Sequence, residues 1–120
     1  MAFDEARKWR ADSMIVINNN FNYRYRADLL ALAIKYRLSS ICGFAELAEA
    51  GGLVSYSASI IDQYRRAASF VDRLLKGAKA AELPFEEPTK FELVVNMKTA
   101  KALGIKVPQS ILVRADRVIE

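Results

Sequence analysis

The sequence predicts an α/β domain of three layers, built around a mostly parallel β-sheet. Apolar runs of strand length alternate along the chain with segments whose apolar residues recur at helical spacing. The run at 13–18 is continuously apolar, which is typical of a parallel strand covered on both faces. With 120 residues, 52% hydrophobic and 27% charged, the chain has the size and composition of a single globular domain, residues 1–120.

The first half of the chain supplies two strands and three helices. A short helix is expected over 3–11 and a strand over 13–18. A helix follows over 23–37, and its apolar stripe consists of Leu29, Leu30, Ala33, Ile34 and Leu38. The next strand is expected over 38–44. A helix of one or two turns then begins at Ala45, and Gly51-Gly52 ends it.

The second half contains the longest helix. A strand over 52–57 leads into a helix over 58–76, which Ser57 or Ser59 caps and Gly77 ends. Residues 78–90 hold two of the three prolines and are expected to form an extended connector. A fourth strand over 90–97 follows. Two helices then close the chain, one ending at Gly104 and one over 108–120 with Pro108 in its first turn.

Several function classes are excluded by composition. The chain has no histidine, which removes Ser-His-Asp and Cys-His catalysis and most transition-metal sites. The single cysteine, Cys42, lies in an apolar run and is expected to be a buried, inert thiol. The net charge of +4 comes from scattered Lys and Arg, which favours solvated helix faces over a nucleic-acid surface. No enzyme activity, cofactor or metal is expected, and neither a membrane span nor a signal peptide is recognisable.

Polar and aromatic residues follow three of the predicted strands. In open parallel sheets, ligands bind outside the carboxyl ends of the strands. The candidate ligand-binding residues are therefore Asn18, Asn19, Asn20, Phe44, Ser55, Tyr56 and Ser57. Each has a structural alternative, because asparagine and serine also cap helices and a tyrosine at a strand end also packs in a core. The residues alone leave these alternatives open.

The run "PTKFELVVNMKTAKALG", followed by "VP" and by a terminal "RAD-VIE", closely resembles the end of the solute-binding proteins of one ABC-transporter family. Better-known members of that family bind aromatic or other amino acids. The segments "YRLSSICGFAELAEAGGLVSYS" and "YRRAASFVDRLLKGAKAAELP" resemble the preceding parts of the same family in the same order. The resemblance covers nearly the whole chain.

The resemblance implies one lobe of a periplasmic-binding-protein type I-like fold, in which two α/β lobes enclose a solute. The chain resembles only the C-terminal part, so the first lobe, the leader and half of the cleft are expected to be missing. It would contribute one cleft wall to an ABC-type importer. Relatives often have an acidic residue where this chain has Asn19, so a charged partner for a ligand amino group is lost. An effector-sensing domain of a transcription regulator is the alternative function.

The resemblance also implies partners and a location. The helix over 58–76 would pack on the first lobe, and without that lobe its stripe of Ile60, Ile61, Tyr64, Phe70, Val71 and Leu74 would be partly uncovered. A homodimer through this helix is therefore expected, with an exchange of the helix between chains as one route. The other partners implied are a small-molecule solute and, in the full-length context, the ABC permease. The implied location is periplasmic or membrane-anchored outside the cytoplasm.

Overall fold

The computed structural model describes residues 2–120, and the chain divides into two compact units. Unit 1 comprises residues up to Ser57 together with Glu92–Glu120, and unit 2 comprises Ala58–Phe91. Among residues 2–120, no helix is long and apolar enough to cross a membrane.

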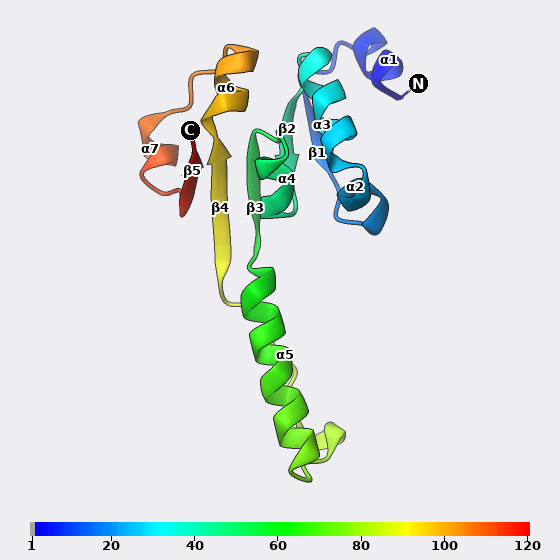
Figure 1. The fold of residues 1–120 in the computed structure, drawn as a ribbon, viewed down its shortest axis with the longest axis vertical. Helices are drawn as coiled ribbons and strands as arrows, with labels where there is room; N and C mark the ends of the chain where they lie inside the picture. The colour runs from blue at the N-terminus through cyan, green and yellow to red at the C-terminus, as the bar shows by residue number, and fades with distance from the viewer. Residues whose placement is uncertain (1) are drawn as a thin grey trace. The chain divides into compact units, whose positions relative to one another are not determined.

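Unit 1 holds the sheet and most of the helices, drawn as a ribbon in Figure 1. Its elements are α1 (Ala2–Lys8), β1 (Ser13–Val16), α2 (Asn20–Arg24), α3 (Arg26–Lys35), β2 (Ser39–Cys42), α4 (Ala45–Glu49), β3 (Val54–Ala58), β4 (Phe91–Asn96), α6 (Met97–Leu103), α7 (Gln109–Leu112) and β5 (Arg117–Ile119). Strands β3 and β4 each extend one residue into unit 2.

The five strands form one sheet in the order β1-β2-β3-β4-β5. Strands β1, β2 and β3 are parallel to one another, and β4 is parallel to β5. The Asn96 N–H donates to the Leu53 carbonyl and the Ser59 N–H donates to the Lys90 carbonyl. Residue numbers rise from 53 to 59 along β3 while those of their partners fall from 96 to 90, so β3 and β4 run in opposite directions. The predicted α/β class with a mostly parallel sheet is therefore confirmed.

The core of unit 1 lies between one face of the sheet and the helices α3 and α4. Val16 of β1 and Cys42 of β2 point to this face and pack with Leu30 of α3 and Leu47 of α4. Leu30 and Leu47 are fully buried. Helix α4 is tied to β4 as well, because the buried Asn96 side chain donates to the Ala48 carbonyl and also caps α6.

The other face of the sheet is open at β1 and β2. Side chains alternate along a strand, so the neighbours of Val16 and Cys42 point away from the core. Ile15 and Ile41 are these neighbours and are paired in register, and their side chains are 76% and 45% exposed.

Unit 2 consists of α5 (Ile60–Leu75), the short 3-10 helix η1 (Ala80–Glu82) and the connector that returns to β4. Helix α5 begins at Ser59, whose hydroxyl accepts a hydrogen bond from the Asp62 N–H, so Ser59 is the cap and not Ser57. It ends before Gly77, which has the positive φ of 99° that favours glycine. No residue of α5 is buried.

Three predicted elements were wrong in part. The helix expected over 23–37 is two helices, α2 and α3, separated at Tyr25, and α2 begins at Asn20 because Asn19 caps it. The connector over 78–90 is not wholly extended, since it contains η1. The helix expected over 108–120 does not include Pro108 in its first turn, because Pro108 is the N-cap residue of α7.

The helix expected over 108–120 was wrong at its end. The structure has the four-residue α7 and then the strand β5, which pairs with β4. Asp116 fixes this pairing, because its N–H donates to the Leu93 carbonyl and its carboxylate accepts from the Leu93 N–H at 2.8 Å. Leu93 and Asp116 lie 23 residues apart, so no local pattern in the sequence predicts this pairing. The β-branched residues Val118 and Ile119 favour a strand over a helix.

Candidate functional site

The candidate residues gather where β1 and β2 end and beside these ends on β3, which continues to Ala58. In the sheet register Val16 lies opposite Cys42, and Cys42 lies opposite Ser55. Asn18, Phe44 and Ser57 each follow this row by two residues. Since the three strands are parallel, their carboxyl ends lie at one edge of the sheet. We call the seven candidate residues at this place the strand-end edge: Asn18, Asn19, Asn20, Phe44, Ser55, Tyr56 and Ser57.

Asn18 joins the ends of β1 and β2. Its side-chain amide donates to the Gly43 carbonyl at 2.9 Å. A Cβ at position 43 would overlap the Asn18 amide, so the close approach requires glycine there. Asn18 therefore has a structural role, and its side chain remains exposed.

Asn19 is the N-cap of α2. Its side-chain oxygen accepts a hydrogen bond from the Asn22 N–H at 2.7 Å. Asn22 in turn donates from its side chain to the Ile17 carbonyl at 2.8 Å, which closes the turn on β1. Asn20, the first residue of α2, is exposed. Two of the three asparagines thus hold the turn, and the amide of Asn20 faces solvent.

Phe44 forms an aromatic group with α2. Its ring contacts the ring of Tyr23 edge-on, with the centroids 6.0 Å apart. The guanidinium of Arg26 lies over the Tyr23 ring, 4.7 Å from its centroid. It also donates a hydrogen bond to the Tyr23 carbonyl. Phe44 packs against the core as well, whereas Tyr23 is 39% exposed. The sequence reasoning missed Tyr23 and Arg26, although the aromatic and basic alternation of "FNYRYR" was a signal for them.

The three candidates on β3 point in different directions. Ser55 is fully buried on the core face, and its hydroxyl has no hydrogen-bond partner among the described residues. Tyr56, on the opposite face, is 59% exposed, and Ser57 is half-buried. Alternation along the strand separates Ser55 from Tyr56, so the two cannot contact one ligand from the same face.

Cys42 lies in the row next to Ser55. Its side chain is buried, and burial raises the pKa of the thiol from 9.0 to about 11. A thiol of this kind stays protonated at neutral pH and is a poor nucleophile, as expected. Among residues 2–120, no group of three or more His, Cys, Asp or Glu side chains could hold a metal ion.

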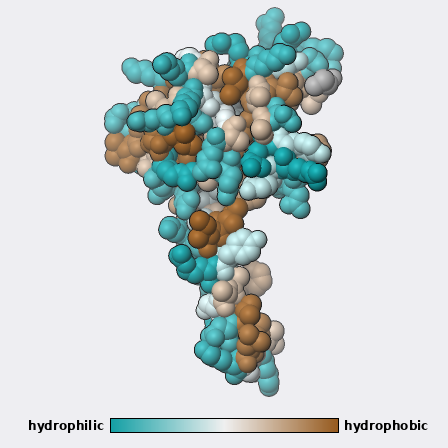
Figure 2. Space-filling model, in the orientation of Figure 1, coloured by the Kyte–Doolittle hydropathy of each residue, from teal (hydrophilic) through white to brown (hydrophobic). Residues whose placement is uncertain are grey.

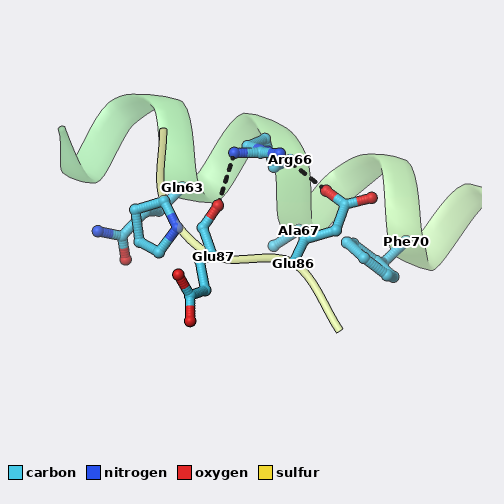
Figure 3. A pocket seen from close by; sticks show the side chains of 7 residues that line it. Gln63, Arg66, Ala67, Phe70, Glu86 and Glu87 are labelled. Carbon is cyan, nitrogen blue, oxygen red and sulfur yellow. Dashed lines mark hydrogen bonds and ion pairs between the residues drawn. The ribbon is translucent and has the colours of Figure 1, made fainter. Parts of the chain in front are cut away.

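Unit 2 has a pocket of about 240 Å³ between α5 and the connector, shown in Figure 3. It is lined by Gln63, Arg66, Ala67, Phe70, Glu86, Glu87 and Pro88. Arg66 donates to the Glu86 carboxylate at 2.9 Å, and to the Glu87 carbonyl and the Thr89 hydroxyl at 3.2 Å each. The cation is thus occupied in holding the connector on the helix. Glu86 and Glu87 do not form a carboxylate pair.

Comparison with protein families places almost the whole chain in one of them. Residues 4–119 match the model of the ABC transporter substrate binding protein family. A comparison with curated proteins gave no match.

Solved structures share the fold. A conserved domain protein from Vibrio cholerae matches with a TM-score of 0.89 at 20% identity, over 98% of this chain. The ABC domain from Streptococcus pneumoniae in complex with L-Trp matches with a TM-score of 0.86 at 25% identity, over 95% of this chain. A ligand-free, open substrate-binding protein from Clostridium difficile matches with a TM-score of 0.70 at 16% identity, over 98%. The chain spans 39% of the length of each of the three.

Proposed function

The chain belongs to the ABC transporter substrate-binding protein family, and we propose that it is the C-terminal lobe of the solute-binding component of an ABC-type importer. Its role there is to bind and not to catalyse. The strand-end edge forms one wall of a cleft, and a facing lobe supplies the other. The observation that carries this proposal is the position of amide, hydroxyl and aromatic groups at the carboxyl ends of the parallel strands β1 and β2 and beside them on β3.

The wall combines apolar and polar groups. Phe44 and Tyr23 offer ring surface, while Asn18, Asn20 and Ser57 offer hydrogen-bond donors and acceptors. Asn19 still has its side-chain N–H₂ to donate, since the cap uses only its oxygen. Ser55 lies behind this surface and supports it.

The proposed solute is an amino acid or a related small molecule. One similar structure is described as a complex with L-Trp, and an aromatic pair beside amide groups suits a solute with a ring and polar ends. The strand-end edge itself has no carboxylate, so recognition of an ammonium group would rest on neutral acceptors. A zwitterion would therefore depend on the facing lobe for its charge partners.

Transport would follow from closure of the two lobes on the solute. Closure completes the cleft, and the closed form is the one that an ABC permease recognises. The proposed location is outside the cytoplasm, periplasmic or membrane-anchored. With one wall only, the chain buries about half of the solute surface that a complete cleft would bury, so its affinity is low.

Titration of a ¹⁵N-labelled chain with L-tryptophan, and with a panel of other amino acids, tests this function. The expected result is a set of saturable shift changes at the strand-end edge and at Tyr23, at millimolar concentrations (about 1 mM or above), with none at α7. Replacement of Asn20 by Ala should weaken these changes, while Gln109→Ala, an exposed polar change on α7, should leave them unchanged. Shift changes centred on another surface, or micromolar binding by this chain alone, would contradict the proposal.

A further inference from the structure

Arg26 is a cation beside the strand-end edge, and its charge is not used within the part of the chain that the structure describes. The residue is half-buried in the first turn of α3, and it forms no ion pair within residues 2–120. One of its terminal nitrogens donates to the Tyr23 carbonyl at 2.8 Å. A guanidinium group has five N–H donors, so most of them remain for another acceptor.

Two aromatic rings connect this cation to the end of β2. The guanidinium lies over the Tyr23 ring, 4.7 Å from its centroid, and the Tyr23 ring contacts the Phe44 ring edge-on. Phe44 follows the last residue of β2 by two positions. A guanidinium donates in its own plane, so contact with a ring through its face leaves those donors available for a carboxylate. A cation and ring surface are therefore close together at the strand-end edge.

The neighbouring polar groups are suited to an anionic end of a solute. Asn18 uses one amide N–H for the Gly43 carbonyl, which leaves its second N–H for a solute oxygen. Asp28 and Glu46 lie in the first turns of α3 and α4, and neither forms an ion pair with Arg26. In Figure 2, hydrophilic residues predominate on the part of unit 1 where Figure 1 places α2.

We propose that Arg26 binds a carboxylate of the solute, and that this wall selects an aromatic carboxylate without an ammonium group over the matching amino acid. The solute ring lies against Tyr23 and Phe44, and its carboxylate accepts hydrogen bonds from the guanidinium and from the Asn18 amide. The inference rests on the proposed function, because it assigns a chemical class of solute to the same cleft wall.

The charges of the solute determine this selection. Hydrogen bonds between a guanidinium and a carboxylate are roughly twice as strong as those between neutral groups. In an α-amino acid the ammonium group is attached next to the carboxylate, so binding of the carboxylate by Arg26 brings two positive charges together. The strand-end edge has no carboxylate to offset that repulsion. Removal of the ammonium group should therefore strengthen binding to this wall.

Titration of the ¹⁵N-labelled chain with four compounds that share an indole ring tests the selection. Indole-3-propionate carries a carboxylate, indole-3-propanamide is its neutral analogue, tryptamine carries an ammonium group and L-tryptophan carries both charges. Indole-3-propionate should bind most tightly, at least about fivefold more tightly than the propanamide, and L-tryptophan should bind more weakly than the propionate. Tryptamine should bind most weakly.

Variants at two arginines test whether Arg26 causes the selection. Arg26→Gln should weaken binding of indole-3-propionate at least about fivefold and leave binding of the propanamide unchanged. A purely structural role, through the bond to the Tyr23 carbonyl, would weaken binding of both compounds equally. Arg26→Lys keeps the charge and should restore part of the preference for the propionate. Arg24→Gln is the matched control, because the Arg24 guanidinium lies over Tyr25, and it should keep the full preference.

The outcomes separate this inference from the proposed function. Shift changes at the strand-end edge with equal affinities for the propionate and the propanamide would overturn the inference and leave the proposed function standing. Tighter binding of L-tryptophan than of the propionate, or an unchanged preference in Arg26→Gln, would do the same. If none of the four compounds caused saturable shift changes at the strand-end edge, the proposed function and the inference would both be contradicted. Circular dichroism confirms that each variant is folded.

Discussion

In unit 1, Leu30, Leu47 and Val95 are fully buried, whereas in unit 2 no residue of α5 is buried. Unit 1 covers one face of its sheet with α3 and α4 and so builds a core from its own elements. Unit 2 has one long helix, and the connector covers only the face of that helix that carries Gln63, Ala67 and Phe70. The same chain therefore contains one unit that buries a core of its own and one unit whose long helix leaves apolar side chains exposed.

The largest expected effect is the loss of core packing in unit 1. Leu30→Ala removes a fully buried side chain from the cluster around Val16 and Leu47, and should lower the free energy of unfolding by about 2–5 kcal/mol. The matched change in unit 2, Leu75→Ala, alters a side chain that is 83% exposed and should cost less than about 0.5 kcal/mol at low chain concentration. Urea denaturation measures both. Equal costs would contradict the contrast between the units.

A pH dependence is expected from Cys42, since burial raises the pKa of its thiol from 9.0 to about 11. The folded chain holds the proton more tightly than the unfolded chain, so stability is full below pH 9 and is lost as pH rises toward 11. The loss from this group is at most about 2–3 kcal/mol. Cys42→Ala should remove this part of the slope, because the variant differs from the wild-type chain in no other titratable group. Parallel slopes in denaturant titrations of the two chains would show that the thiol does not contribute.

A smaller effect is expected at the asparagine turn. Asn19→Ala removes the cap of α2 and should cost about 1 kcal/mol, while Asn20→Ala leaves the turn intact and should be nearly neutral. Thermal or urea unfolding compares the two. If Asn20→Ala were the more destabilising change, the assignment of the cap to Asn19 would be wrong.

The smallest effect is expected from the contacts that Arg66 makes with the connector in unit 2. Arg66→Ala removes the contacts with Glu86, Glu87 and Thr89, and Arg66 and Glu86 are each about one-third exposed, so the cost should be no more than about 1 kcal/mol. Faster amide exchange over 85–90 should report the loosened connector. The neighbouring Arg65→Ala should leave that exchange unchanged in dilute solution. Equal exchange in the two variants would mean that Arg66 does not hold the connector.

Local signals in the sequence predicted much of the fold. Gly51, Gly77 and Gly104 end helices as expected, and all three have positive φ. Strand β5 was missed because it has three residues and owes its pairing to Leu93, which is distant in sequence. The break at Tyr25 was missed because no glycine or proline stands near it in the sequence to mark the end of a helix.

The positions of the candidate residues were predictable in part, but their contacts were not. Strand order predicted Asn18 and Phe44 just past the ends of β1 and β2, as the structure has them, whereas Ser57, predicted as the end of its strand, lies within β3. The amide partners were not predictable, because Asn18 bonds to Gly43, 25 residues away. The burial of Ser55 and the exposure of Tyr56 depend on which sheet face α3 and α4 cover, and no local pattern gives that.

Native-state hydrogen exchange tests most directly whether unit 1 is held by its own core while unit 2 is not. Protection of α3 around Leu30 should approach the free energy of global unfolding, since its core is complete within the chain. Protection of α5 over residues 64–75 should be much lower, because none of its residues is buried. If α5 were protected as strongly as α3, the contrast between the two units would be contradicted.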